Sequence, residues 1–165
     1  MTGQAMGLLQ RYAELTTRLA EACADLYGDR LISLVVFGSV GRGTPKPDSD
    51  VDLLLIAEPL PKGRMARVEE FAQVERRLGA ERSPLDTPCI SPVFKTPEEV
   101  ARGSALFLDI VEDARILLDR NGFFAGFRER FRQRLSELGA KRIWIGSAWY
   151  WDLKPDYRPG EVFEL

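Results

Sequence analysis

Residues 31–57 read LISLVVFGSVGRGTPKPDSDVDLLLIA, and this stretch decides the fold. Residues 31–37 form an almost continuous apolar run of strand length, which predicts a strand buried on both faces. Residues 50–57, DVDLLLIA, predict a second strand of the same kind. Between them, residues 38–47 are rich in Gly and Pro and predict a turn that contains a short helix. The centre of the chain is therefore expected to be two buried strands joined by a glycine-rich turn.

The segments on either side predict helices and two more strands. Apolar residues at steps of three and four predict a first helix that ends near Gly28. Residues 84–95 predict a weak strand that is either an edge strand or a bulged one, because Pro88 and Pro92 interrupt it. The other expected elements are a helix over about 64–78 with Val68 on its buried side, a helix capped by Thr96, a helix through Phe107 and Val111, a strand over 115–118, and a helix with Phe124, Phe131 and Leu135 on one face. This order predicts an α/β (α+β) fold, a small mixed β-sheet with helices packed on it.

Length and composition set the expected domain organisation. The chain has 165 residues, of which 45% are hydrophobic and 29% charged, and this composition excludes a disordered or fibrous chain. We expect a single domain over residues 1–165. Residues 143–165 contain all three tryptophans and are expected to form an aromatic tail packed on that domain.

The chain contains no histidine, which excludes catalysis by Ser-His-Asp or Cys-His groups and zinc sites with histidine ligands. Any metal binding or proton transfer must therefore depend mainly on carboxylates. The formal net charge of −2 does not indicate a general surface for polyanions, and a nucleic-acid partner is not expected. Residues 120–142 hold seven basic and two acidic side chains, which leaves open a local patch for a nucleic acid or an acidic partner.

The location of the protein is predicted from what the sequence lacks. The first residues show no basic segment followed by an apolar one, and no apolar run approaches the ~20 residues of a membrane span. Cys23 and Cys89 form no closely spaced motif, which favours a reducing compartment. We expect a cytoplasmic protein with no membrane association.

Four residues in the central stretch have the types and spacing that phosphate chemistry requires. Gly38 and Ser39 follow the first strand, where glycine allows close approach of a ligand and exposed amides attract phosphate. Asp50 and Asp52 lie two apart on a strand, so both carboxylates point from one face. Such a pair beside a triphosphate is unfavourable without a cation, and its hard oxygen ligands favour Mg²⁺. Arg42 lies within the same loop, where it can reach a phosphate or stay solvated.

The Gly-Ser, Gly-Arg-Gly and Asp-x-Asp segments of residues 31–57 resemble the nucleotidyltransferase superfamily related to DNA polymerase beta, in particular its minimal prokaryotic members. The resemblance implies an enzyme with Asp50 and Asp52 as catalytic, Mg²⁺-binding residues. It implies Gly38, Ser39 and Arg42 as residues that bind the phosphates of a nucleoside triphosphate, ATP in the first place. A nucleoside monophosphate would pass to a hydroxyl of a protein or small molecule, and a HEPN-domain protein would be a partner.

The chain departs from this family at the third carboxylate, which the family usually carries on a later strand. The corresponding stretch, residues 90–95, reads ISPVFK and holds no acid, so Ser91 is expected at that position. Asp86 is a candidate substitute, although Pro84 and Pro88 favour a loop there. This departure leaves a second hypothesis open, a nucleotide-binding partner protein with weak catalysis, such as the antitoxin of a HEPN-type toxin. Asp-x-Asp alone also occurs in metal-dependent glycosyltransferases. The purely structural interpretation has Gly38 as a turn residue, Ser39 as a helix N-cap, and Asp50 and Asp52 as solvated charges at the end of a strand.

Overall fold

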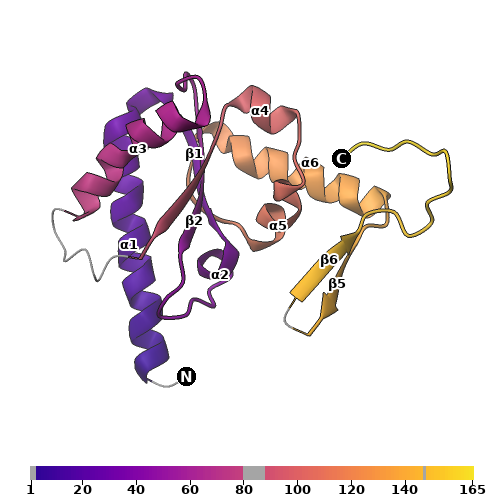
Figure 1. Ribbon diagram of the computed structural model, residues 1–165, viewed down its shortest axis with the longest axis horizontal. Coiled ribbons are helices and arrows are strands. Elements are labelled where there is room, and N and C mark those ends of the chain that lie inside the picture. Colours follow the sequence, from indigo (N-terminus) through magenta and orange to yellow (C-terminus); the bar gives the residue numbers. More distant parts are fainter. Residues whose placement is uncertain (1–2, 80–87, 147) are drawn as a thin grey trace. The chain divides into compact units, whose positions relative to one another are not determined.

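The structure is a computed structural model that describes residues 3–79, 88–146 and 148–165 (Figure 1). It divides into two compact units, Met1–Phe123 and Phe124–Leu165. The first unit contains the central stretch of the sequence and the candidate site residues. The expectation of one domain over 1–165, with 143–165 packed on it, stays a prediction.

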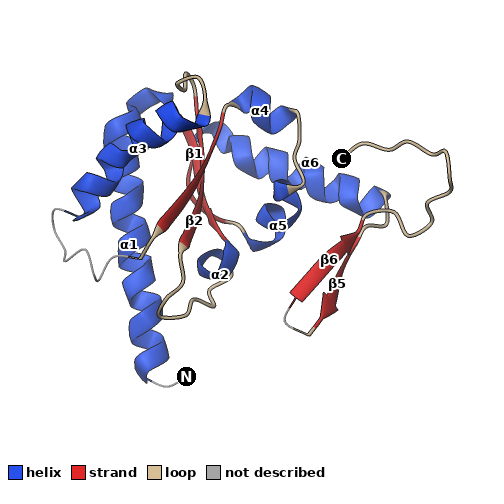
Figure 2. Cartoon of the chain, viewed as in Figure 1, coloured by secondary structure: helices blue, strands red, loops and turns tan. Residues whose placement is uncertain are grey.

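The first unit contains a four-stranded mixed sheet, as the sequence predicted (Figure 2). Its strands are β1 (Leu31–Phe37), β2 (Val51–Ala57), β3 (Ile90–Lys95) and β4 (Arg115–Asp119), in the order β3-β2-β1-β4. β1 pairs antiparallel with both β2 and β4, whereas β3 runs parallel to β2. β3 therefore lies at an edge, which confirms the expectation drawn from its prolines.

The helices of this unit begin and end close to the expected positions. They are α1 (Gly3–Tyr27), α2 (Gly38–Gly41), α3 (Arg64–Gly79), α4 (Pro97–Ala101) and α5 (Leu106–Asp113), with short 3-10 turns at Gly28–Arg30 and Arg120–Gly122. Gly28 has a φ of +54°, the left-handed conformation that ends many helices. Thr96 and Glu99 form the expected capping box at the start of α4.

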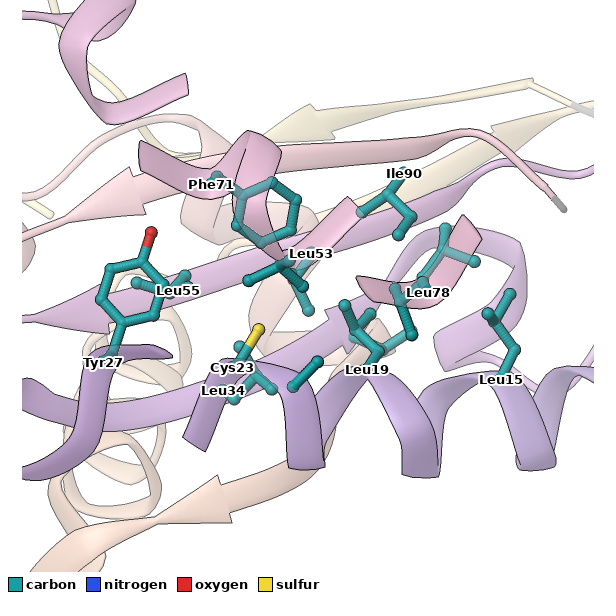
Figure 3. Packing of buried hydrophobic residues seen from close by; sticks show 14 of the residues in the cluster. Leu15, Leu19, Cys23, Tyr27, Leu34, Leu53, Leu55, Phe71, Leu78 and Ile90 are labelled. Atoms are coloured by element: carbon teal, nitrogen blue, oxygen red, sulfur yellow. The ribbon is translucent and has the colours of Figure 1, made fainter. Parts of the chain in front are cut away.

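The hydrophobic core lies between one face of the sheet and the helices α1 and α3. Figure 3 shows side chains of α1 pointing toward side chains of β1 and β2, with α3 contributing Phe71 and Leu78. The α1 residues in this core are spaced three and four apart, and they include Leu15, Leu19, Cys23 and Tyr27. Burial raises the pKa of the Cys23 thiol to about 12, so Cys23 is an apolar core residue rather than a reactive thiol.

The opposite face of the sheet is also covered. Val35, Leu54 and Ile56 are fully buried, and the alternation of strand side chains places them on the face away from α1 and α3. Phe107, Ile110 and Val111 of α5 are buried too, and α5 contacts β1. Asp52 shares the face of Leu54, so the candidate site opens on the side of the sheet where α5 lies.

One residue of α3 differs from the expectation. Val68 was predicted on the buried side of this helix, but 37% of its surface is exposed. The buried residues of α3 are Phe71, Val74 and Leu78, so its apolar stripe begins one turn later than the sequence suggested. The prediction for Val68 was wrong because this side chain faces an open cavity beside β3 instead of the core.

The second unit contains α6 (Phe123–Glu137) and a hairpin of β5 (Lys141–Ile145) and β6 (Ala148–Asp152). The sequence predicted α6 and an aromatic tail after it, and in the structure part of that tail forms the hairpin. Within the hairpin, the rings of Trp144 and Trp149 lie 4.9 Å apart, and the Arg142 guanidinium lies 4.1 Å from the Trp149 ring. None of the helices in the described ranges is long and apolar enough to cross a membrane.

Candidate functional site

The candidate site begins at α2, the turn of helix that follows β1. Phe37 at the end of β1 is extended, and Gly38 then adopts a φ of +65°, a conformation that glycine tolerates best. This sharp change of direction starts α2 at Gly38 and Ser39, as the Gly-Ser pair predicted. The first amides of a helix have no partner within the helix, so the backbone here is suited to an anionic ligand.

The two aspartates lie beside this turn. Asp50 is exposed and comes directly before β2, while Asp52 is its second residue and is partly buried. Desolvation by burial raises the pKa of the Asp52 carboxyl, and the negative charge of Asp50 raises it further. Arg42 acts in the opposite direction and lowers the pKa of Asp52. Asp50 and Arg42 therefore both lie close enough to Asp52 to act on its charge.

The raised pKa of Asp52 gives a prediction for the metal-free protein. Because the folded state holds the Asp52 proton more tightly than the unfolded state, stability should fall as pH rises from the ordinary Asp value of about 3.9 through the raised value. Asp52→Asn should remove this part of the pH dependence and should be at least as stable at pH 7. Urea unfolding of both proteins across pH 3 to 7 measures the difference, and superimposable pH profiles would contradict the assignment.

Gly38 is required at its position for a second reason besides its backbone. A Cβ atom built on Gly38 would overlap the Oδ2 atom of Asp52. Gly38→Ala should therefore both strain the left-handed backbone and displace the Asp52 carboxylate. We expect a loss of stability of about 1 kcal/mol or more and weakened metal-dependent nucleotide binding. Gly43→Ala is the control, since Gly43 also has a positive φ but has open space around it; an equal effect on binding would contradict the role of Gly38.

The loop that leads to Asp50 is held by a small hydrogen-bond network around Ser49. The Ser39 hydroxyl donates to the Ser49 hydroxyl oxygen at 3.1 Å, and the Lys46 amide donates to the same oxygen at 2.9 Å. The Tyr12 hydroxyl donates to the Ser49 carbonyl at 2.6 Å. These bonds connect α1, α2 and the loop, so they position Asp50 relative to Ser39.

Sequence reasoning missed Tyr12 and Ser49 as parts of this site. Tyr12 was assigned to the apolar stripe of the first helix, where its ring is indeed buried. A signal for a further role was present, because a buried tyrosine hydroxyl normally requires a hydrogen-bond partner. The partner itself lies 37 residues away and could be found only in the structure.

Arg42 lies directly after α2 and is held by an acid from another helix. Its Nη1 atom forms an ion pair with Oδ2 of Asp113, the last residue of α5. The Arg42 side chain is 30% exposed and that of Asp113 5% exposed. Arg42 is thus an exposed residue whose guanidinium is held by a buried carboxylate.

The strand next to Asp52 carries no acid at the expected position. In the parallel register of β2 and β3, Asp52 pairs with Ser91, as the sequence analysis anticipated. Asp86, the candidate substitute, lies outside the described residues. Within the described ranges, no three or more His, Cys, Asp or Glu residues are grouped so that they hold a metal ion. Two carboxylates, Asp50 and Asp52, are therefore the acidic groups that the described structure offers to a cation.

A cavity of about 490 Å³ extends from Asp52 along β3. Ser91 and Val93 of β3 line it, together with Phe37 at the end of β1 and Leu106 at the start of α5. Further lining comes from α3, which explains why Val68 is exposed although it is apolar. The arrangement combines a phosphate-suited turn, an acidic pair and an adjoining space that can admit a second reactant.

Comparisons with known proteins agree with this arrangement. Residues 17–117 match the model of the nucleotidyltransferase domain family. A protein of Methanocaldococcus jannaschii, with the provisional name protein adenylyltransferase MJ1305, is 33% identical over 139 residues, which are 81% of this chain and 88% of that protein. The chain therefore belongs to the nucleotidyltransferase domain family, and it is a nucleotidyltransferase by that membership.

Two further likenesses concern a larger enzyme and a solved structure. The bifunctional uridylyltransferase/uridylyl-removing enzyme of Cupriavidus metallidurans is 30% identical over 128 residues, 75% of this chain but 14% of that enzyme. The crystal structure of a toxin–antitoxin with AMP-PNP matches 74% of this chain and 90% of that chain, with 18% identity and a TM-score of 0.48.

Proposed function

We propose that this protein transfers a nucleoside monophosphate from a nucleoside triphosphate to a hydroxyl of a protein or small molecule, with Mg²⁺ bound at Asp50 and Asp52. The observation that carries the proposal is the Asp50–Asp52 pair directly beside the turn at Gly38. In the reaction, the acceptor oxygen bonds to the α-phosphorus while the bond to the pyrophosphate oxygen breaks. The acceptor proton leaves to solvent or to a nearby base.

The residues present fit a magnesium ion. Mg²⁺ is usually bound by one or two carboxylates together with phosphate oxygens and water, which matches two aspartates next to a phosphate-suited turn. Burial and, after it, the charge of Asp50 raise the pKa of Asp52, and a cation bound at this pair would act against both effects. When bound, Mg²⁺ would offset charge on the triphosphate and on the leaving pyrophosphate.

The other residues of the site would position the reactants. The amides of Gly38 and Ser39 would bind phosphate oxygens, and the network around Ser49 would hold this turn against the acidic pair. The cavity along β3 would admit the acceptor beside Asp52. A related protein bears the provisional name of a protein adenylyltransferase, which supports ATP as donor and a protein as acceptor.

The function is tested by incubating the protein with Mg²⁺ and each of the four α-labelled nucleoside triphosphates. Samples contain either a mixture of host proteins or a mixture of small hydroxyl compounds. Release of pyrophosphate with label transferred to an acceptor, with ATP preferred, is the expected result. Release of inorganic phosphate in place of pyrophosphate would contradict the proposed reaction.

A second candidate function is favoured by Ser91, which occupies the position of an acid beside Asp52. In this case the protein binds a nucleotide and a protein partner but transfers the nucleoside monophosphate slowly. The HEPN-domain partner stays a prediction, and size-exclusion chromatography with a co-expressed HEPN-domain protein tests it. The cytoplasmic location also stays a prediction, which fractionation of expressing cells can check.

A further inference from the structure

Asp113 is a buried carboxylate that the proposed reaction has not used. It is the last residue of α5 and only 6% of its surface is exposed. Burial of a carboxylate costs free energy, and the carbonyl groups at the end of a helix add unfavourable negative charge. The negative charge of Asp113 therefore lowers the stability of the fold in two ways, and the positive charge of Arg42 offsets both.

The contact between α5 and α2 involves the backbone as well as this ion pair. A Cβ atom on Gly41, the last residue of α2, would overlap the Asp113 carbonyl oxygen. It would also lie 2.8 Å from the Val36 carbonyl oxygen. The end of α5 thus packs directly against the end of α2, and α2 is too short to be stable without such support.

Arg42 connects this buried contact to the nucleotide site. One of its Nη atoms engages Asp113, while 30% of its side chain remains exposed. Its positive charge also acts on Asp52 across the site. A guanidinium carries five N–H donors in a planar fork, so one arginine can bind a carboxylate and a phosphate at the same time.

We propose that Asp113 is a positioning residue that holds the Arg42 guanidinium in place to bind a phosphate of the nucleoside triphosphate. This inference rests on the proposed function and adds a residue to the same site. A free arginine side chain loses rotamer freedom when it binds a phosphate. Because Asp113 already restricts the Arg42 side chain, part of this conformational freedom is lost before the nucleotide binds, and the entropy cost of binding is smaller.

The alternative is a pair that only stabilises the fold, and the experiment must separate the two roles. Replacing Arg42 alone would leave the buried Asp113 carboxylate without this ion pair, which destabilises the fold. The double variant Arg42→Gln with Asp113→Asn instead replaces the ion pair by two amides of similar size. We expect an unfolding temperature close to that of the parent and a Kd for Mg²⁺–ATP that is about 10- to 100-fold weaker by calorimetry.

The matched control is Arg30→Gln with Glu70→Gln, which neutralises another ion pair of the first unit. That pair has an N–O distance of 2.7 Å, an arginine side chain as exposed as that of Arg42 (31% against 30%) and an acid that is 19% exposed, against 5% for Asp113. Its Kd for Mg²⁺–ATP should stay unchanged. An unchanged Kd in the Arg42→Gln, Asp113→Asn variant would overturn the proposal.

A further variant covers the case in which the double variant does not fold. Asp113→Asn keeps Arg42 and the size of the Asp113 side chain but removes the charge that holds the guanidinium, so binding of Mg²⁺–ATP should be about tenfold weaker. Parent affinity in a folded Asp113→Asn variant would overturn the proposal. Failure of the proposed function gives a different result. In that case Mg²⁺–ATP binding would remain after both Asp50 and Asp52 are replaced by Asn.

Discussion

Asp50→Asn combined with Asp52→Asn should abolish Mg²⁺-dependent nucleotide binding while leaving the protein folded. Asn keeps the size of the side chains but removes both negative charges that would bind the cation. Stability at pH 7 should stay the same or rise, because the cost of burying the Asp52 charge and its repulsion by Asp50, which together raise the pKa of Asp52, both disappear. Calorimetry with Mg²⁺–ATP and thermal unfolding of the same samples measure the two effects.

The control for this variant is Asp48→Asn, which removes an exposed negative charge from the same loop. Its nucleotide binding should remain that of the parent. If the double variant keeps its Mg²⁺–ATP affinity, the metal site is elsewhere and the roles given to Asp50 and Asp52 are wrong. If the double variant loses both binding and the folded structure, the single variant Asp50→Asn tests the metal site instead. Asp50 is exposed, so its replacement should leave the protein folded and weaken Mg²⁺–ATP binding.

Ser91→Asp should raise the rate of nucleotide transfer by a large factor. Ser91 pairs with Asp52 across β2 and β3, so an aspartate there would stand next to the acidic pair. A general base that accepts the acceptor proton is typically worth about 10²- to 10⁴-fold in rate. We expect a gain in this range in kcat, with little change in the Kd for Mg²⁺–ATP.

The same substitution should lower stability when Mg²⁺ is absent, because a third negative charge would join two that already repel each other. Added Mg²⁺ should restore that stability, which gives a readout independent of turnover. Ser91→Asn is the matched control, since it has the size of Asp but no charge and should leave kcat unchanged. A Ser91→Asp protein that folds, binds Mg²⁺–ATP and transfers no faster would contradict this placement.

Asp86 is tested in the same assay. If the unsubstituted protein already has a third acid at Asp86, Asp86→Ala should eliminate transfer and spare nucleotide affinity. We expect the opposite, with little change in transfer, because the position paired with Asp52 belongs to Ser91.

The strands and most helices could be predicted from the sequence because their signals are local. The strands over residues 31–37 and after Asp50 follow from nearly continuous hydrophobicity over a few residues. The edge position of β3 followed from Pro92, since proline lacks an amide for a second strand. Val68 was predicted wrongly because periodicity gives the apolar stripe of a helix but not which part of that stripe lines a cavity instead of the core.

The sequence by itself determined the acidic pair, the glycine-led turn and hence the family, because these residues lie within one short loop and two strands. The tertiary structure alone decided which distant groups complete the site. Asp113 reaches Arg42 from 71 residues away, and Tyr12 reaches Ser49 from 37 residues away. Such pairs depend on how α5 and α1 pack on the sheet, and packing depends on the shape of the whole core rather than on any local pattern.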